Sequence, residues 1–326
     1  MLAIKGFPQN LMFVSESLRD DEDVVSEAIA EYSDMFSYAS ERLKDDFNFV
    51  EKLVSTRPRI MLHVSDRLRR NKYIVIKSLR KYDCCAKDYI SESLFNNRYI
   101  MKLLVENDGL LLKNAPPELR EDLSIVMAAV GNTGEAMKFV APHLMDNTEV
   151  VMRAVKTKCN IDRISDRLKD NKDVARLAVK SKGDNYWHLS ERLKNDREII
   201  ELAVSSDPHI IKHMCPSFRK DVEIAKLAVE KWGYIITYFD EELLDNEDVI
   251  AAVLKNNGKM LKYASPRLRD DEYMLKIALD NHWDAIKYAS QRLKSVLDDI
   301  SADSTLSYSR RLYLYIQGNM VKSAKK

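Results

Sequence analysis

The chain of 326 residues is poor in the residues that interrupt regular structure, with only eight glycines and eight prolines. All-β folds need frequent tight turns, so this scarcity disfavours them and favours helices. An excess of charge is also missing, because 52 Lys and Arg are balanced by 51 Asp and Glu, giving a formal net charge of +1. Such a chain has no overall attraction to nucleic acid or to anionic lipid.

Long apolar runs and paired cysteines are absent too. No segment approaches the roughly 18 consecutive apolar residues of a membrane-spanning helix, and residues 1–10 hold no apolar run of signal-peptide length. The four cysteines form no CxxC pair; they are Cys84, Cys85, Cys159 and Cys215. We therefore expect no membrane partner, and a reducing, cytoplasmic compartment rather than a secreted disulfide framework.

What the chain does contain is a tandem repeat with a period of about 25 residues, a length typical of solenoids. Similar strings such as SERLKDD, SDRLKDN and SPRLRDD recur around one leucine, which serves as an anchor for alignment. Twelve anchors follow one another at nearly equal steps: Leu18, Leu43, Leu68, Leu94, Leu119, Leu144, Leu168, Leu193, Phe218, Leu243, Leu268 and Leu293. In a solenoid, each unit buries its apolar face only against its neighbours.

The repeat has recognisable helix signals. Three residues after the anchor, eleven of the twelve copies have Asp or Asn, a residue that caps a helix start; Asn171 and Asp271 are two examples. Apolar residues follow six, seven, ten and eleven places past the anchor and form one helical stripe. A Gly or Pro ten residues before the next anchor then predicts a turn, and a second, shorter apolar stripe follows it.

A second break precedes each anchor, where Ser is commonly followed by Pro or an acidic residue, as in Ser265–Pro266. This pair predicts a capped start for one short helical turn. The whole pattern predicts an all-α fold, an α-solenoid of about twelve two-helix repeats. We expect an N-terminal cap at residues 1–10, one continuous array over 11–295, and a C-terminal capping helix and tail at 296–326.

The string YASPRLRDD at residues 263–271, followed by an aliphatic helix, resembles a tandem repeat family catalogued as a domain of unknown function. The consensus of that family is close to LxYASxxLRxDxxVVxxAV. The likeness covers about residues 11–295 and is clearest at 262–279 and 287–294. It implies an all-helical repeat fold, a viral or bacterial origin and no assigned chemistry; a host or defence protein would be a plausible target for such a protein.

Motifs for catalysis are missing: the sequence has no glycine-rich phosphate loop, HExxH, GxSxG or zinc-type cysteine pairing. His209, His213 and Cys215 could in principle bind a metal, because His at i and i+4 share a face of an α-helix. Their columns, however, usually hold an aromatic residue, His or Ser, so a packing role is preferred. The acidic pairs recur with the repeat and one member of each is interpreted as a cap, so a structural role is preferred to acid–base catalysis. We therefore expect no enzyme activity, no cofactor and no metal.

Two surfaces are candidates for binding. Three tryptophans are expected at the surface, where exposed aromatics make binding hot spots, and they are our candidate contacts for a partner protein: Trp187, Trp232 and Trp283. The alternative is a nucleic-acid groove lined by basic columns beside the anchor: Arg42, Lys44, Arg67, Arg69, Arg167, Lys169, Arg192, Lys194, Arg267 and Arg269. Acidic columns lie beside these and suggest ion pairs between repeats, so a protein-binding scaffold is the preferred hypothesis.

Overall fold

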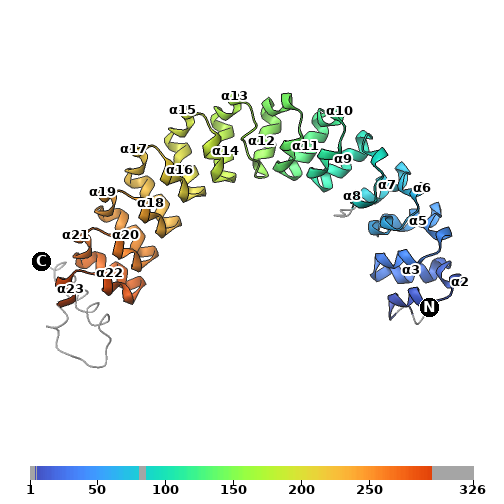
Figure 1. Cartoon of the computed structure of the whole chain (residues 1–326), viewed down its shortest axis with the longest axis horizontal. Helices are drawn as coiled ribbons and strands as arrows, with labels where there is room; N and C mark the ends of the chain where they lie inside the picture. The colour runs from blue at the N-terminus through green and yellow to red at the C-terminus, as the bar shows by residue number, and fades with distance from the viewer. Residues whose placement is uncertain (1–3, 5, 81–85, 296–326) are drawn as a thin grey trace, which may run out of the picture. The chain divides into compact units, whose positions relative to one another are not determined.

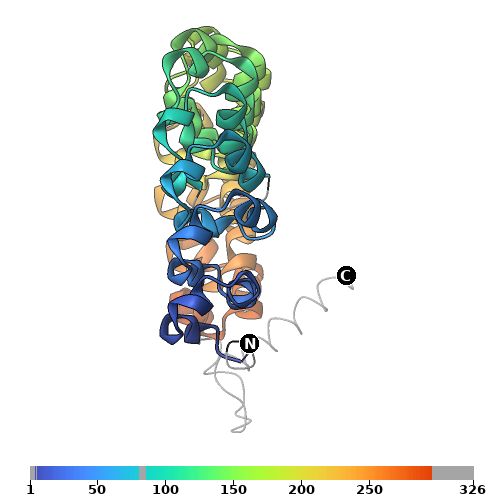
Figure 2. The same cartoon turned by 90° about the vertical axis from the view of Figure 1, so that its right-hand side faces the viewer.

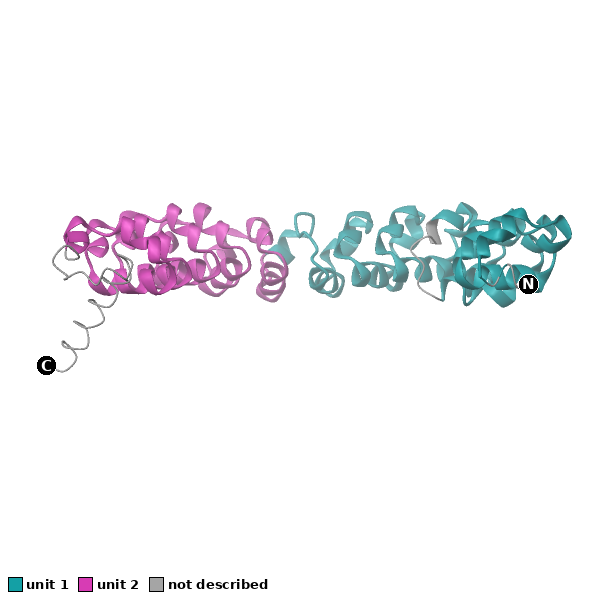
Figure 3. Cartoon of the chain, turned by 90° about the horizontal axis from the view of Figure 1, so that it is seen from below, with its two compact units in different colours: residues 1–169 teal, residues 170–326 magenta. Residues whose placement is uncertain are grey.

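The structure is a computed structural model, and it describes residues 4, 6–80 and 86–295. The chain divides into two compact units, residues 1–169 and residues 170–326 (Figure 3), and each is described by itself. All regular secondary structure among the described residues is helical, which confirms the predicted all-α solenoid of tandem repeats. Within the same residues, none of the helices is both long and apolar enough to cross a membrane. The predicted segment 296–326 lies outside the described residues.

Unit 1 begins with a 3₁₀ helix and ends with a four-residue α-helix. Its elements are η1 (Pro8–Phe13), α2 (Glu16–Arg19), α3 (Glu22–Glu31), η2 (Ser33–Tyr38), α4 (Glu41–Lys44), α5 (Phe47–Val54), η3 (Pro58–Leu62), α6 (Asp66–Arg69), α7 (Lys72–Leu79), α8 (Ala86–Tyr89), η4 (Glu92–Leu94), α9 (Arg98–Asn107), η5 (Gly109–Asn114), α10 (Pro117–Arg120), α11 (Leu123–Asn132), η6 (Gly134–Phe139), η7 (Pro142–Asp146), α12 (Thr148–Lys156) and α13 (Asp166–Lys169).

Unit 2 repeats the same order of elements with greater regularity. They are α14 (Lys172–Ser181), η8 (Gly183–His188), α15 (Glu191–Lys194), α16 (Arg197–Ser206), η9 (Pro208–His213), α17 (Pro216–Arg219), α18 (Val222–Lys231), η10 (Gly233–Tyr238), α19 (Glu241–Leu244), α20 (Glu247–Asn256), η11 (Gly258–Tyr263), α21 (Pro266–Arg269), α22 (Glu272–Asn281), η12 (Trp283–Tyr288) and α23 (Gln291–Ser295).

Each regular repeat therefore has three helical elements: a long α-helix, a 3₁₀ helix and a four-residue α-helix, as in α20, η11 and α21. The two-helix prediction needs correction in one respect, since the second helix is a 3₁₀ helix of six residues, as η11 shows. The predicted second stripe has positions three apart, with Leu261 inside η11 and Ala264 at its C-cap, and this spacing suits the three-residue turn of a 3₁₀ helix as well as an α-helix. The apolar pattern alone could not separate the two.

The elements of each unit form two layers (Figures 1 and 2). In unit 2 each long helix contacts the next long helix, from α14 through to α22, and the 3₁₀ helices η9 to η12 contact one another in a second layer. The stripe predicted on the long helix is buried between the layers; in α14 it consists of Val174, Ala175, Ala178 and Val179. The anchor leucines are buried as well, with the exceptions of Leu18, Leu119 and Phe218.

The predicted caps are confirmed throughout. All eleven Asp and Asn residues of the cap column accept backbone N–H groups at the start of the long helix that follows: Asp21, Asp46, Asn71, Asn97, Asp122, Asn147, Asn171, Asp196, Asp221, Asn246 and Asp271. A serine such as Ser265 likewise caps the four-residue helix by accepting the N–H of the anchor Leu268. Every long helix thus begins at a residue fixed by the local sequence.

Glycine at the predicted turn has a different reason from the one expected. No described glycine has a positive φ. At Gly258, a Cβ atom would lie 2.1 Å from the carbonyl oxygen of Ala278 in the next long helix, and at Gly109 it would lie 2.3 Å from that of Ala129. Glycine is required at these two positions because adjacent repeats approach too closely for a side chain.

The repeat between Leu144 and Leu168 departs from the pattern. The step from Leu144 to Leu168 is one residue shorter than the step before it, and the segment 157–164 forms no 3₁₀ helix. Lys158 in this segment adopts a φ of 63°, in the left-handed region that is unfavourable for a side chain. The shortened repeat lies just before the boundary between the units at Lys169 and Asp170.

Candidate functional site

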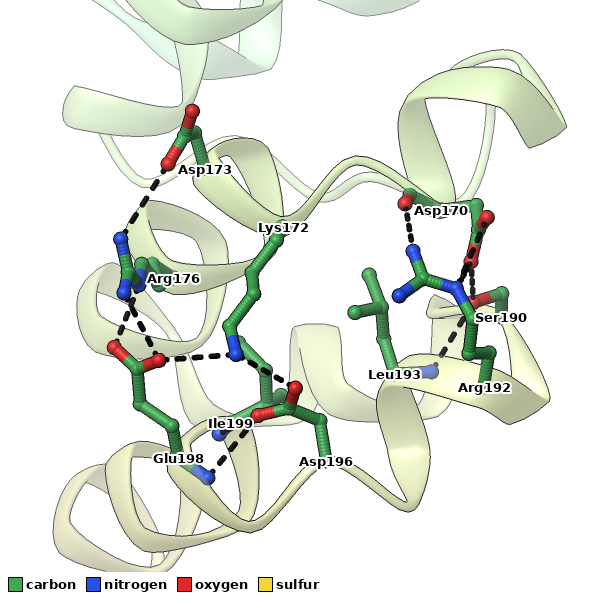
Figure 4. A network of polar contacts seen from close by, with 10 residues as sticks. All are labelled: Asp170, Lys172, Asp173, Arg176, Ser190, Arg192, Leu193, Asp196, Glu198 and Ile199. Atoms are coloured by element: carbon green, nitrogen blue, oxygen red, sulfur yellow. Dashed lines mark hydrogen bonds and ion pairs between the residues drawn. The ribbon is translucent and has the colours of Figure 1, made fainter.

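The arginine column is built into a clamp between successive repeats, which Figure 4 shows at Asp170, Ser190 and Arg192. The Ser190 hydroxyl donates to the Asp170 carboxylate and accepts the N–H of Leu193 at 3.3 Å. Arg192 donates from Nε to Asp170 Oδ1 at 3.0 Å and from Nη2 to the Asp170 carbonyl oxygen at 2.7 Å. One carboxylate therefore joins the end of one repeat to the start of the next.

The same clamp occurs six times among the described residues, each time with Asp in one repeat and Ser and Arg in the next. The sets are Asp20, Ser40 and Arg42; Asp45, Ser65 and Arg67; Asp146, Ser165 and Arg167; Asp170, Ser190 and Arg192; Asp245, Ser265 and Arg267; and Asp270, Ser290 and Arg292. The serine hydrogen bond, followed by the arginine, lowers the pKa of every one of these carboxyl groups. Ion pairs between repeats, expected from the alternating charges, are thus present.

The basic residue after the anchor is held within its own repeat. Lys44 pairs with Glu41 at 2.8 Å and Lys194 with Glu191 at 2.9 Å, and the two lysine side chains are only 15% and 23% exposed. Lys169 pairs with Asp166 and Arg69 with Asp66 in the same way. Arg269 is half-buried. The ten residues of the proposed nucleic-acid ladder are therefore mostly ion-paired. Those directly after the anchor are also largely shielded from solvent.

A second set of ion pairs joins successive long helices of unit 2 (Figure 4). Lys172 lies 2.6 Å from Asp196 Oδ2 and 3.1 Å from Glu198 Oε2, and Arg176 Nε lies 2.6 Å from Glu198 Oε1. Asp196 is also the helix cap of its repeat, so a single carboxylate caps α16 and attracts the neighbouring helix α14. The acidic residues beside the anchor have structural partners of this kind.

Among the described residues, the clamp is missing at the junctions before the anchors Leu94, Leu119, Leu144, Phe218 and Leu243, where the sequence departs from the consensus in two regions. In the second region the charges are reversed, because Lys220 occupies the aspartate position and pairs with Glu242 at 3.0 Å. In the first region, the side chain of Asn132 joins two repeats: it donates to the Glu106 carbonyl at 3.0 Å and accepts the Gly109 N–H at 2.9 Å. Asn281 makes the same two contacts, with Lys255 and Gly258, where the clamp is also present. Cys84 and Cys85 lie outside the described residues.

All three tryptophans belong to unit 2 and are partly exposed, as expected: Trp187 by 37%, Trp232 by 41% and Trp283 by 43%. Two of them contact histidines of η9: Trp187 on η8 and Trp232, the residue directly before η10. The Trp187 ring meets the His213 ring edge-on at a centroid distance of 5.6 Å, and the His209 and Trp232 rings are 4.1 Å apart. We call Trp187, His209, His213 and Trp232 the tryptophan cluster. Trp283 lies on η12 and is not part of it.

The geometric premise of the metal hypothesis was wrong. His209 and His213 lie on a 3₁₀ helix, where residues three apart share a face and residues four apart do not. Accordingly, His209 contacts Trp232 of the following repeat and His213 contacts Trp187 of the preceding one. Cys215 is exposed, and a hydrogen bond with Ser217 lowers the pKa of its thiol. Across the described part of the chain, no three His, Cys, Asp or Glu side chains are grouped to hold a metal ion.

Sequence reasoning missed the residues beside the tryptophan cluster. The Lys212 ammonium lies 3.9 Å from the centroid of the Tyr238 ring in the next repeat, and Tyr234 lies 6.3 Å from Trp232 between ring centroids. Tyr234 and Tyr238 are both exposed. The sequence did contain a signal, since one column of the repeat holds an aromatic residue or His in most copies. Which of these rings contact one another depends on how the repeats pack, and this could not be predicted.

Comparison with a protein-family model finds it seven times along the chain, at residues 1–44, 97–145, 147–194, 174–219, 196–244, 221–269 and 246–294. The matches cover more than half of the chain and overlap in the regular part of unit 2. Among curated proteins and among solved structures, none matches this chain. Both the tandem matches and the repeat geometry lead to one assignment: the chain belongs to the family described as Domain of unknown function (DUF4116).

Proposed function

We propose that the chain is a non-enzymatic scaffold that binds another protein through the 3₁₀-helix layer of unit 2. The observation that carries this proposal is the tryptophan cluster, in which Trp187 and Trp232 stay exposed although histidines hold them in place. A large aromatic ring that is both exposed and oriented can bury much apolar area on binding while losing little conformational freedom.

The use of the charged residues supports binding rather than catalysis. In the pair Asp270–Asp271, the first carboxylate joins the next repeat through Arg292, and the second caps α22. Both members of such a pair therefore have partners, and their recurrence in successive repeats fits a structural role. A catalytic pair would need one carboxyl free to exchange a proton with a substrate.

The basic ladder gives less support to nucleic-acid binding. Counterion release on DNA or RNA needs cations that can turn toward phosphates, and here the arginines pair with aspartates of the neighbouring repeat. Binding of phosphates by Arg192 or Arg267 would therefore compete with the contacts that join the repeats. We retain nucleic acid as one outcome of the test.

The test is affinity purification of the full chain from its native cells, with and without nuclease, comparing the wild type with two variants. The Trp187→Ala, Trp232→Ala double variant removes the cluster, and Tyr99→Ala removes an even more exposed aromatic ring from the long helix α9 as a control. We expect a protein that resists nuclease, is lost with the double variant and is kept with the control. Identification of that protein also decides whether the target is a host or defence protein.

Loss of the recovered material on nuclease treatment would overturn the proposal in favour of the basic ladder. Equal recovery with the wild type and the double variant would also overturn it, because the tryptophan cluster would then contribute nothing. The separate variant Trp283→Ala asks whether the docking surface continues to η12.

A further inference from the structure

The 3₁₀ helices η9, η10 and η11 of unit 2 contact one another in succession and carry basic and aromatic residues. Together they contain Lys212, Lys259 and Lys262 with two histidines, and no Asp or Glu. This contrasts with the chain as a whole, in which acidic and basic residues are nearly equal in number. We call Lys212, Trp232, Tyr234, Tyr238, Lys259 and Lys262 the lysine–aromatic face.

The lysines of this face differ from the basic ladder in having no acidic partner. Lys212 lies over the Tyr238 ring at 3.9 Å and Lys262 over the Tyr263 ring at 4.6 Å, and within the described residues neither forms an ion pair. A cation over an aromatic ring is held in position without being neutralised, because the ring carries no net charge. These ammonium groups therefore remain available to an anionic ligand.

The same column in unit 1 holds Lys113 and Lys138. The six residues of η5, which carries Lys113, include no aromatic ring, and Lys138 of η6 pairs with Glu135 one turn earlier at 2.5 Å. On η2 of unit 1, an aspartate, Asp34, faces the solvent. An excess of unpaired positive charge among aromatic rings thus distinguishes η9–η11 from η2 and η6.

The positive charge and the exposed rings of the lysine–aromatic face together define the chemistry of its ligand. Carboxylates would pair with Lys212 and Lys262, and an apolar side chain beside them would pack on Trp232 and Tyr234, which are 41% and 50% exposed. A single-stranded nucleic acid fits less well, since base stacking needs open ring faces. Here His209 packs against Trp232, and the Lys212 ammonium occupies a face of Tyr238.

We propose that the lysine–aromatic face binds an acidic segment of a partner protein, one that carries Asp or Glu beside an aromatic or aliphatic residue. This inference rests on the proposed scaffold function and specifies the chemistry of its partner. Because the attraction is electrostatic, binding should weaken as salt concentration rises.

The experiment selects a displayed library of short random peptides on the full chain, and then measures the binding of the enriched peptide by fluorescence anisotropy. We expect enriched peptides rich in Asp and Glu with at least one aromatic or leucine residue. Replacement of their Glu by Gln should weaken binding at least tenfold. Enrichment of neutral or basic peptides, or tighter binding of an oligothymidine than of the enriched peptide, would overturn the proposal.

Two matched double variants locate the binding site. Lys212→Glu with Lys262→Glu should weaken the enriched peptide at least tenfold, whereas Lys113→Glu with Lys138→Glu makes the same change of charge in unit 1 and should change binding less than twofold. Equal losses with both pairs would contradict the assignment to η9–η11. Trp232→Ala tests the same face without a change of charge and should weaken binding too, and circular dichroism checks that each variant is folded.

The two proposals can fail separately. A native partner that depends on Trp187 and Trp232 but binds the Lys212→Glu, Lys262→Glu variant as tightly as the wild type would leave the scaffold function standing and overturn the acidic segment. An acidic peptide that binds the face, with no native protein retained by the full chain, would support the surface chemistry and overturn the scaffold function.

Discussion

Asp170 and Arg192 are joined across two successive repeats by both the side chain and the backbone of the aspartate. The arginine Nε donates to Asp170 Oδ1 at 3.0 Å, and its Nη2 donates to the Asp170 carbonyl oxygen at 2.7 Å. The carbonyl contact fixes the backbone directly before the cap of the next long helix, Asn171. Such a clamp couples the position of each repeat to the one before it.

The clamp makes the stability of the fold depend on pH. The Ser190 hydroxyl and then Arg192 lower the pKa of the Asp170 carboxyl in the folded chain, relative to an unfolded value of about 3.9. A group with a lowered folded pKa stabilises the protein above the unfolded pKa, and this contribution is lost as pH falls through the folded pKa. We expect Asp170→Asn to reduce the fall in the urea midpoint between pH 7 and about pH 3.

The control for this prediction is Asp184→Asn, which removes an exposed carboxyl group of the same unit. Its urea midpoint should follow the wild type across the same pH range. If Asp170→Asn and Asp184→Asn behave alike, the Asp170 carboxyl does not contribute through its clamp.

Glycine at the start of the 3₁₀ helix should be required at some repeats and dispensable at others. A Cβ at position 258 would lie 2.1 Å from the carbonyl oxygen of Ala278, a backbone atom that cannot move aside without shifting α22, whereas a Cβ at Gly233 would meet nothing nearer than Met260 at 4.0 Å. We expect Gly258→Ala to destabilise the chain by about 1–3 kcal/mol. Gly233→Ala should be neutral or should stabilise by about 0.4–1 kcal/mol, because alanine restricts the unfolded chain.

Chemical denaturation of the two alanine variants measures the difference. The two positions occupy the same column of the repeat, so helix propensity and sequence context are closely matched. Equal destabilisation would show that the backbone conformation, rather than the approach of the next helix, is the reason for glycine.

Replacing an anchor leucine should lower the free energy of unfolding more than replacing a helix cap. Leu68 is completely buried, so Leu68→Ala leaves a cavity and should cost about 2–5 kcal/mol. Asn71 accepts the N–H groups of Tyr73 and Ile74 at the surface, so Asn71→Ala should cost only about 1 kcal/mol. Urea unfolding of the two variants checks this order, and equal losses would contradict the roles given to the two columns.

Local contacts explain how much of the fold could be predicted. The cap at Asp271 bonds to the N–H of Met274, three residues away, so a single sequence column was sufficient to locate it. The 3₁₀ helices were not predicted, because the buried positions of the second stripe lie three apart and fit both helix types. The reason for Gly258 was also out of reach, since the clash is with Ala278 in the following repeat.

In the candidate site, too, features set by local sequence were predicted and contacts between repeats were not. The exposure of Trp187 was predicted correctly, since exposure follows from the position of a residue in the repeat. The contact of Trp187 with His213 could not be predicted, because it requires the stacking distance between two 3₁₀ helices. Ser190 was predicted as a cap, but its bond to Asp170 joins different repeats and carries no local signal.

The reversed junction between Lys220 and Glu242 offers a test of whether the clamp stabilises the fold. Here Asp240 stands where the clamp has serine. The basic residue, Lys220, is in the first repeat and the acidic residue, Glu242, is in the second, 3.0 Å apart. The triple variant Lys220→Asp, Asp240→Ser, Glu242→Arg restores the consensus clamp, with the serine hydrogen bond that the natural junction lacks. We expect it to gain about 0.5–2 kcal/mol in free energy of unfolding. The single variant Lys220→Asp places three carboxylates together and should be less stable than the wild type by about 0.2–1 kcal/mol. Urea unfolding compares the variants, and a triple variant no more stable than the wild type would show that the clamp does not add to the stability of the fold.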